Sequence, residues 1–600
     1  MRLPASWKPD QFNIGKEYSM KLPLRIVIVM ALLSLLGAVP SGPALAQLGD
    51  TAVTDQTYLR HDGGSDPTID ACDDDSNTTT AGGNRQQNEP SVAINPSNPD
   101  VIVAGSNDYC TVPSTTDAWM GFYVSTDGGA SWTDSLNPGY PGDTSAEGLA
   151  SPTFGRAVAA GDPIMDWDNE NRLFYGGISF NRTQPANGDV LVSTWEYAPG
   201  TPLNMDYLRT VIVGRGTPSV AGRFNDKPSL HVDDWEGSPH EGNVYVSWTL
   251  FPGGGQDQIL FSRSTDHGVT FSKPIKISKA VASAQGSDIA VAPDGTVYVT
   301  WRQFAFNPNV INAIVFVKST DGGQTFSNPQ IVQPVVPYDR SDQYVTGGSA
   351  RDCGDGPFLC VSQFVFHRVA AFPQAVVDAN GNVYVTWEEL IPAADNGDTY
   401  RPDGQAQVVV SKSTDGGATW GNPVFIDPQA SGHQWWPNLE YDRATGTIVA
   451  VYFDSRADPS YSVNRPPGNE ADGTSPCGEP GSQVCEILDT FFATSTDGVS
   501  WSATLASDLG HQPEYEMFGN RDTAFHGDYL WIDANGGSVY GVWVDNRDVV
   551  PGVDPREATQ DGFDVLQCRE LQEDGSFGPD TCPNAGGLNQ NIYGASLSLP

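Results

Sequence analysis

Short runs of alternating hydrophobic and polar residues recur along the chain, and each run is interrupted by an Asp, Asn or Gly turn. Examples are SDIAVAPDGTVYVTWRQ from Ser287, FPQAVVDANGNVYVTWEE from Phe372 and GDYLWIDANGGSVYGVWVDNRD from Gly527. Alternation with a period of two is typical of half-buried strands, and D-G, N-G or G-G steps favour hairpin turns. Each run is therefore predicted to be a β-hairpin.

The hairpins belong to a longer repeat. A third strand such as QVVVSKS or AIVFVKS and a fourth such as PVFID or PIKIS follow them, with degenerate third strands in the second and seventh units (DVLVSTWEYAPG and FDVLQCRELQEDGSFG). Four-stranded sheets arranged radially bury both faces between neighbours. The pattern predicts an all-β propeller over residues 89–600 with seven blades, and six blades plus a decorated terminus is the alternative. The units start at Glu89, Gly161, Asp226, Ser287, Phe372, Trp436 and Gly527.

One short stretch is repeated almost unchanged between the third and fourth strands. It reads STDGGASW, STDHGVTF, STDGGQTF, STDGGATW and, in a clipped copy, STDGVSW. An Asp in such a turn can accept backbone N–H bonds, and a Gly can adopt a left-handed backbone. A local, structural role is therefore predicted for its aspartates, which are Asp127, Asp266, Asp321, Asp415 and Asp497.

The pattern S-x-D-x-G-x-x-W/F resembles the Asp box of the sialidase (BNR-repeat) superfamily. Four copies fit it fully, the fifth lacks one residue before its Gly, and the resemblance covers roughly residues 89–578. It implies a secreted bacterial sialidase-like propeller in which the boxes lie on the face away from the active site.

The boxes orient the predicted propeller. If they mark the bottom, the ends of the second strands and the starts of the first strands meet at the top, around the channel mouth. Arg binds carboxylates there through a planar fork, and Trp offers stacking surfaces for sugars. Alternatively, these Arg residues form ion pairs with Asp residues and so link neighbouring blades. The candidate substrate-binding residues are Arg223, Arg302, Arg456, Arg547, Trp301, Trp387 and Trp436.

The resemblance also implies roles in catalysis. Sialidases combine three Arg, a Tyr–Glu nucleophile pair and an Asp acid/base. Here Arg302, Arg456 and Arg547 are candidates for the triad, Tyr529 for the nucleophile with Glu388 or Glu389 as its base, and Asp226 or Asp528 for the acid. The family's Arg-Ile-Pro motif is missing. The nearest text is RFNDKP at Arg223, so no role is carried over from that motif.

Three functions follow from these residues. The first is a sialidase-like glycoside hydrolase acting on an acidic glycan, which needs Tyr529 beside a carboxylate and at least three unpaired Arg. The second is a non-catalytic glycan- or protein-binding or adhesion propeller, whose Arg would be neutralised by Asp454, Asp545 and Asp548. The third is a polysaccharide lyase, and the histidines that bear on it are His231, His367, His511 and His526.

The N-terminus predicts export. Met20 is the expected start, IVIVMALLSLLGAV is an apolar run of signal-peptide length, and cleavage is expected after Ala46. An uncleaved anchor is the alternative. No second apolar segment of this kind occurs, so the mature chain is predicted to lack a membrane span and to be secreted, extracellular or periplasmic. Residues 1–46 form the extension and leader, and residues 47–88 form a polar, loosely ordered segment.

The net charge indicates which classes of partner the protein can have, and the cysteines predict its disulfides. The formal net charge is −41, and removing residues 1–46 changes it to 27 − 71 = −44. This acidity argues against nucleic acid and anionic membranes. No cofactor is required, calcium is the candidate metal, and a monomer is expected. The eight cysteines predict four local disulfides, Cys72 with Cys110, Cys353 with Cys360, Cys477 with Cys485 and Cys568 with Cys582.

Overall fold

The computed structural model describes most of the chain from Gln47 onward. The described residues are 47–54, 56–72, 86–111, 117–181, 187–217, 223–253, 256–279, 283–305, 310–336, 369–392, 404–458, 461, 487–511, 526–548 and 590–600. The predicted leader, His367 and six of the eight cysteines lie outside these residues. No helix in the described part of the chain is long and apolar enough to cross a membrane.

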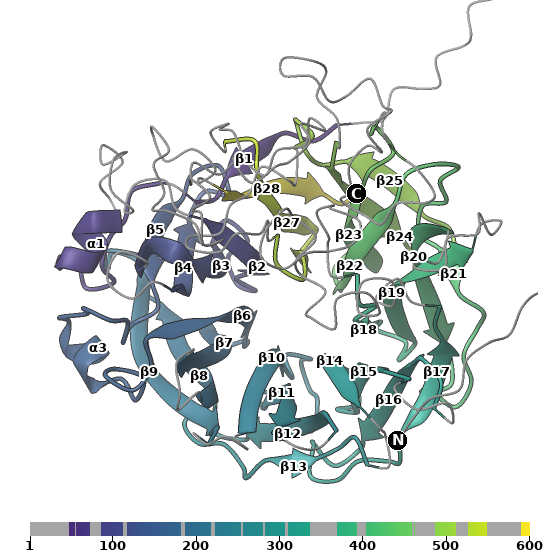
Figure 1. The fold of residues 1–600 in the computed structure, drawn as a ribbon, viewed down its shortest axis with the longest axis horizontal. Coiled ribbons are helices and arrows are strands. Elements are labelled where there is room, and N and C mark those ends of the chain that lie inside the picture. The colour runs from purple at the N-terminus through teal and green to yellow at the C-terminus, as the bar shows by residue number, and fades with distance from the viewer. Residues whose placement is uncertain are drawn as a thin grey trace, which may run out of the picture. The chain divides into compact units, whose positions relative to one another are not determined.

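Seven four-stranded antiparallel sheets form the ring in Figure 1. In blades one to six the strands follow sequence order. The first three blades are β2 (Gln87–Ile94), β3 (Ile102–Asp108), β4 (Trp119–Ser125) and β5 (Thr133–Leu136); β6 (Ala159–Trp167), β7 (Arg172–Asn181), β8 (Asn187–Tyr197) and β9 (Met205–Gly214); and β10 (Arg223–Val232), β11 (Val244–Pro252), β12 (Gln258–Ser264) and β13 (Ile275–Lys276).

The next three blades repeat this order. They are β14 (Ala284–Val291), β15 (Val297–Gln303), β16 (Ala313–Ser319) and β17 (Gln330–Pro334); β18 (Gln374–Val377), β19 (Val383–Pro392), β20 (Gly404–Ser413) and β21 (Val424–Phe425); and β22 (Gln434–Asp442), β23 (Thr447–Asp454), β24 (Asp489–Ser495) and β25 (Ser502–Leu505). Seven blades are thus confirmed over the six-bladed alternative, and β8 is the degenerate third strand expected in the second unit.

The seventh blade joins the two ends of the ring. It consists of β26 (Trp531–Asn535), β27 (Ser538–Asp545), β28 (Asn591–Ser598) and the N-terminal β1 (Asp50–Ala52), whose register pairs Asp50 with Ala595 and Ala52 with Tyr593. The expected third strand, FDVLQCRELQEDGSFG, lies outside the described residues, and β28 holds that place instead. Part of the polar segment 47–88 therefore belongs to the ring.

A second contact ties the N-terminal segment to blade one. The short helix α1 (Pro67–Cys72) ends at Cys72, which forms the predicted disulfide with Cys110 in the 3₁₀ turn η1 (Tyr109–Thr111). The other described helix, α3 (Ala146–Ala150), starts at the N-cap Ser145, whose side chain accepts the Gly148 N–H.

The core lies between the blades. Strands such as β15, VYVTWRQ, are buried at six of seven positions because each sheet packs against a neighbour on both faces. Tryptophans of the second strands fill these interfaces, and Trp248 also donates its indole N–H to Asn225 Oδ1 at 2.8 Å. The inner strands of neighbouring sheets leave a central channel, which holds the candidate site.

Candidate functional site

The five S-T-D turns at the bottom of the blades use their polar groups locally. In the turn after β20, Ser413 Oγ donates to Asp415 Oδ1 (2.8 Å) and accepts from Gly417 N (2.8 Å). Asp415 also accepts from the Thr419 N–H (2.8 Å) and hydroxyl (2.6 Å), and the Thr419 bonds lower the pKa of Asp415 to about 2. Equivalent bonds occur in the other four copies. The Asp carboxylates are therefore held by hydrogen bonds within their own turns.

Three of these turns also link neighbouring blades. The cation that precedes the Ser of one turn donates to a backbone carbonyl of the turn in the next blade: Arg263 to Gly322 at 2.5 Å, Lys318 to Gly416 at 2.7 Å, and Lys412 to Asp497 at 3.0 Å. Three of the chain's few Lys and Arg side chains therefore form contacts at the bottom of the ring.

The opposite ends of the blades repeat a different feature. Near the start of each inner strand, one residue has a left-handed backbone, with φ between 49° and 85°. In five blades a register shift marks a β-bulge there. Bulges re-aim side chains, and left-handed non-Gly residues are strained, which is common at functional sites. The seven residues are Glu89, Asp162, Lys227, Gly286, Ala371, Trp436 and Gly527.

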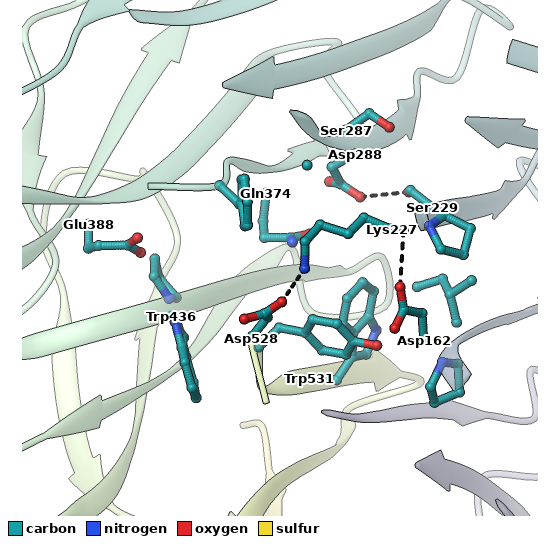
Figure 2. A pocket seen from close by; sticks show the side chains of 17 residues that line it. Asp162, Lys227, Ser229, Ser287, Asp288, Gln374, Glu388, Trp436, Asp528 and Trp531 are labelled. Atoms are coloured by element: carbon teal, nitrogen blue, oxygen red, sulfur yellow. Dashed lines mark hydrogen bonds and ion pairs between the residues drawn. The ribbon is translucent and has the colours of Figure 1, made fainter. Parts of the chain in front are cut away.

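Four of these residues, Asp162, Lys227, Gly286 and Trp436, line a cavity at the channel mouth (Figure 2). Its empty space, including the solvent-filled opening, is about 660 Å³. Aromatic walls come from Phe372, Trp436, Tyr529 and Trp531, and Gly286 is needed because a Cβ there would lie 2.1 Å from the Phe372 ring. The polar lining consists of Asp162, Lys227, Ser229, Ser287, Asp288, Gln374, Glu388 and Asp528.

One ion pair joins distant blades inside this cavity. Lys227 of blade three points toward Asp528, which precedes β26 of blade seven, and the two side chains form a salt bridge (Figure 2). Lys227 Nζ also lies 5.3 Å from the centroid of the Phe372 ring, a cation–π contact with blade five. The ammonium group is therefore held by a carboxylate and an aromatic face together.

A carboxyl cluster lies beside this lysine. The Lys227 N–H donates to Asp162 Oδ2 and to Asp226 Oδ1, both at 3.0 Å, and Glu89 accepts from Asn107 Nδ2 at 2.8 Å. Burial raises the pKa of Asp162 well above its usual value, and the nearby Asp226 and Glu89 raise it further. The cavity wall thus carries a carboxyl group that favours its neutral form.

Tyr529 and Glu388, the predicted nucleophile and base, both line the cavity but have separate surroundings. Burial raises the pKa of Tyr529 well above 10, and the carboxylates that add most to this shift are Glu89, Asp162 and Asp528. Glu388 accepts from the Ala371 N–H, and burial raises the pKa of Glu388 to about 7. Burial also raises the pKa of Glu389. The carboxylate neighbours of Tyr529 are therefore different from those the sequence predicted.

The three arginines predicted to bind an acidic substrate are engaged elsewhere. Arg456 forms salt bridges with Asp427 and Asp454, and Arg547 with Asp50 and Asp545. Arg302 is fully buried and donates to Ala370 O at 3.1 Å and Asn312 Oδ1 at 2.9 Å. None of the three lines the mouth cavity. Instead of the expected triad, Arg456 and Arg547 each pair with two aspartates, and Arg302 bonds to carbonyl oxygens of other chain segments.

The tryptophans predicted to stack on a sugar fall into two groups, buried and cavity-lining. Trp301 and Trp387 are fully buried between blades, so they cannot stack on a ligand, because neighbouring sheets cover both ring faces. Trp436 does line the cavity, and Trp531 faces it from blade seven. Arg223 is exposed at the outer end of β10, away from the cavity lining. Asp226 and Asp528, the predicted acids, both contact Lys227.

Deeper in the channel, carboxylates connect neighbouring inner strands. Asp533 accepts from the Ile94 N–H at 2.6 Å, Asp166 from Val232 N–H at 2.7 Å, and Asp288 from Ala375 N–H at 2.8 Å. At the bottom, Arg443 of blade six pairs with Asp234 of blade three and lies 4.0 Å from the Trp235 ring centroid. This contact spans the lower end of the channel, so the mouth is the wider approach for a ligand.

The remaining histidines lie apart from the mouth cavity. His231 lines the deeper channel beside Asp166. His511 and His526 stack on each other with ring centroids 5.3 Å apart, and burial lowers the pKa of His511 to about 4. Within the described ranges, no group of three or more His, Cys, Asp or Glu is arranged to hold a metal ion.

Sequence reasoning missed Asp162 and Trp531 as cavity residues. The available signal was an x-Pro step near the start of the first strand, present as Glu89-Pro90, Asp162-Pro163, Lys227-Pro228, Phe372-Pro373 and Trp436-Pro437. Because the residue before proline is restricted in conformation, a repeated x-Pro step marks a repeated backbone feature. At Glu89, Asp162, Lys227 and Trp436 it coincides with the left-handed residue, but it does not reveal what the side chains face.

The fold and site define a seven-bladed β-propeller with a carboxyl- and tryptophan-lined cavity at one channel mouth. No protein-family model matches the sequence, and no curated protein matches it.

Solved structures resemble the fold at low similarity. A protein of unknown function from Dyadobacter fermentans shares 11% identity over 86% of this chain and 96% of that one (TM-score 0.36). The GH93 α-L-arabinofuranosidase of Fusarium graminearum shares 12% identity over 62% of this chain and 88% of that one, with a TM-score of 0.35. The Trypanosoma rangeli sialidase shares 12% identity over 62% of this chain and 53% of that one, with a TM-score of 0.37. At this level the likeness concerns the fold alone.

Proposed function

We propose that this protein binds a glycan in the mouth cavity and hydrolyses it as a glycoside hydrolase. The observation that carries the proposal is the presence of two unlike carboxyl groups in one cavity, the neutral-favouring Asp162 and the salt-bridged Asp528. Glycosidases typically need one carboxyl group that donates a proton and a second that is ionised. Trp436 and Trp531 supply the flat apolar surfaces against which a sugar ring can pack.

In this reaction Asp162 donates its proton to the glycosidic oxygen as the bond to the anomeric carbon breaks. Water adds to the anomeric carbon and loses its proton to the Asp162 carboxylate, so the acid is restored. Asp528 stabilises the positive charge that develops on the sugar ring. Tyr529 stays protonated because its pKa is raised, and it acts as a hydrogen-bond donor to the substrate.

Sialidase-like recognition of an acidic sugar is not part of this proposal. It would require guanidinium groups at the cavity, and Arg456 and Arg547 instead pair with aspartates. The same pairing favours a second candidate function, a secreted propeller that binds glycans without cleaving them.

An oligosaccharide screen separates the two functions. Product analysis and calorimetry would compare the wild type with Asp162→Asn and with the control Asp206→Asn, which changes an exposed aspartate on β9. We expect hydrolysis by the wild type and the control, and binding without hydrolysis by Asp162→Asn. Binding without hydrolysis by all three proteins would replace the first function with the second. If no oligosaccharide binds, both are overturned.

A further inference from the structure

The ionisable side chains that face the mouth cavity are almost all carboxyl groups. Asp162, Asp288, Glu388 and Asp528 line it, and among the described residues of the lining Lys227 alone carries a positive side chain. Burial and the surrounding hydrogen bonds leave Asp288 with a pKa of about 6, so part of this acidity persists near neutral pH. A ligand that carries a carboxylate would therefore enter an environment of like charge.

The position of the Lys227 ammonium is a built cation site. It is bounded by the carboxylate of Asp528, whose side chain is 1% exposed, and by the face of Phe372 at 5.3 Å. A carboxylate combined with an aromatic face is a favourable arrangement for an ammonium ion. The occupant is a flexible lysine whose own backbone is strained at φ 49°. The structure thus holds a cation site filled by one of its own side chains.

We infer that the cavity selects a glycan unit bearing a basic amino group, whose ammonium displaces Lys227 from Asp528 and Phe372. This inference rests on the proposed glycan-binding function and names its substrate class. The exchange keeps one positive charge on Asp528, so no buried carboxylate is left unpaired. An acidic sugar bound by Lys227 would instead separate the lysine from Asp528 and leave that carboxylate without its cation.

The experiment uses three tetrasaccharides that differ in charge: a glucosamine tetramer, an N-acetylglucosamine tetramer and a galacturonic acid tetramer. Binding to the wild type is measured by calorimetry. Because the chain carries a net charge of −41, cationic sugars will also adhere nonspecifically. Measurements in about 1 M salt, where the screening length is roughly 3 Å, together with a one-to-one stoichiometry, isolate the site.

Variants locate the selectivity. Lys227→Met removes the internal competitor and should strengthen glucosamine binding several-fold. Asp528→Asn should abolish the preference for the amine. Lys276→Met, an exposed lysine on β13, is the control and should change neither.

Tighter binding of the glucosamine tetramer, by tenfold or more, with these variant effects supports the inference. Equal affinity for the amine and N-acetyl sugars, or tightest binding of the acidic tetramer with loss in Lys227→Met, overturns it and leaves glycan binding standing. If none of a broad set of glycans binds, the proposed function fails as well.

Discussion

The two ends of the blades use repetition in opposite ways. At the bottom, five turns repeat both the backbone shape and the residues, and the first Ser and the Asp of each turn bond to each other. At the top, a left-handed residue recurs in all seven blades but its identity changes from Glu to Asp, Lys, Gly, Ala and Trp. Repeated identity thus marks the fold, and changing identity on a repeated backbone marks the site.

The two ends of the blades also differ in backbone strain. Each bottom turn places a Gly at the strongly left-handed position beside the inter-blade interface, such as Gly417 with φ 84° and Gly129 with φ 90°. Gly adopts this conformation without strain. The top uses Glu89, Asp162, Lys227, Ala371 and Trp436, for which the left-handed backbone costs about 1–2 kcal/mol per residue. Three of these five residues, Asp162, Lys227 and Trp436, line the mouth cavity.

The largest expected effect is on turnover in Asp162→Asn. Asn tolerates the left-handed backbone and retains an acceptor for the Lys227 N–H, but it cannot donate an acidic proton. Hydrolysis should fall about 100- to 10,000-fold while the urea midpoint stays equal or rises. Steady-state kinetics and urea unfolding of the same preparation test both halves. A variant that loses activity only because it unfolds would place Asp162 with the structural residues.

Arg547→Ala tests the reassignment of the top arginines. The substitution leaves Asp50 and Asp545 buried without their cation and weakens the join between β1 and the rest of the ring. Removing one partner of a buried ion pair costs about 3–5 kcal/mol. Urea unfolding monitored by tryptophan fluorescence gives the free energy directly. A fully stable variant that no longer binds glycan would return Arg547 to the substrate-binding role that the sequence suggested.

Ser413→Ala should have a smaller effect confined to stability. The buried Ser413 hydroxyl accepts the Gly417 N–H, and its loss leaves that donor unsatisfied at a cost of about 1–2 kcal/mol. Thermal and urea unfolding measure the loss, and glycan hydrolysis should be unchanged. A change in turnover without a change in stability would contradict the division between the two ends.

The smallest effect is a difference in pH dependence. Burial raises the pKa of Asp162, so its contribution to stability is complete below about pH 4 and is lost as the pH rises through the folded pKa. Thr419 lowers the pKa of Asp415 to about 2, so its contribution is present above about pH 4 and is lost as the pH falls toward 2. The free energy of unfolding is measured from pH 2 to 8. Asp162→Asn should reduce its fall with rising pH on the high-pH side, and Asp415→Asn should reduce its fall on the acid side. The same slope change in both variants would contradict this contrast.

Local sequence determined the blades and their orientation. Alternating residues with D-G and N-G turns predicted hairpins, and the S-T-D repeats predicted self-contained turns, because these interactions are complete within about eight residues. Seven four-stranded blades and the disulfide between Cys72 and Cys110 were predicted correctly. The place of β1 and β28 in the last blade was not, because their pairing joins residues more than 500 positions apart.

The site depended on contacts that no local pattern contains. Arg456, Arg547, Trp301 and Trp387 have the residue types of a sugar-binding mouth, yet tertiary packing directs them to aspartates or blade interfaces. Lys227 meets Asp528 only because the closed ring brings blades three and seven to one mouth. Sequence alone therefore determined the repeating unit and its two ends. Only the tertiary structure decided which side chains share the cavity, because a ring places strand starts far apart in the chain beside one another.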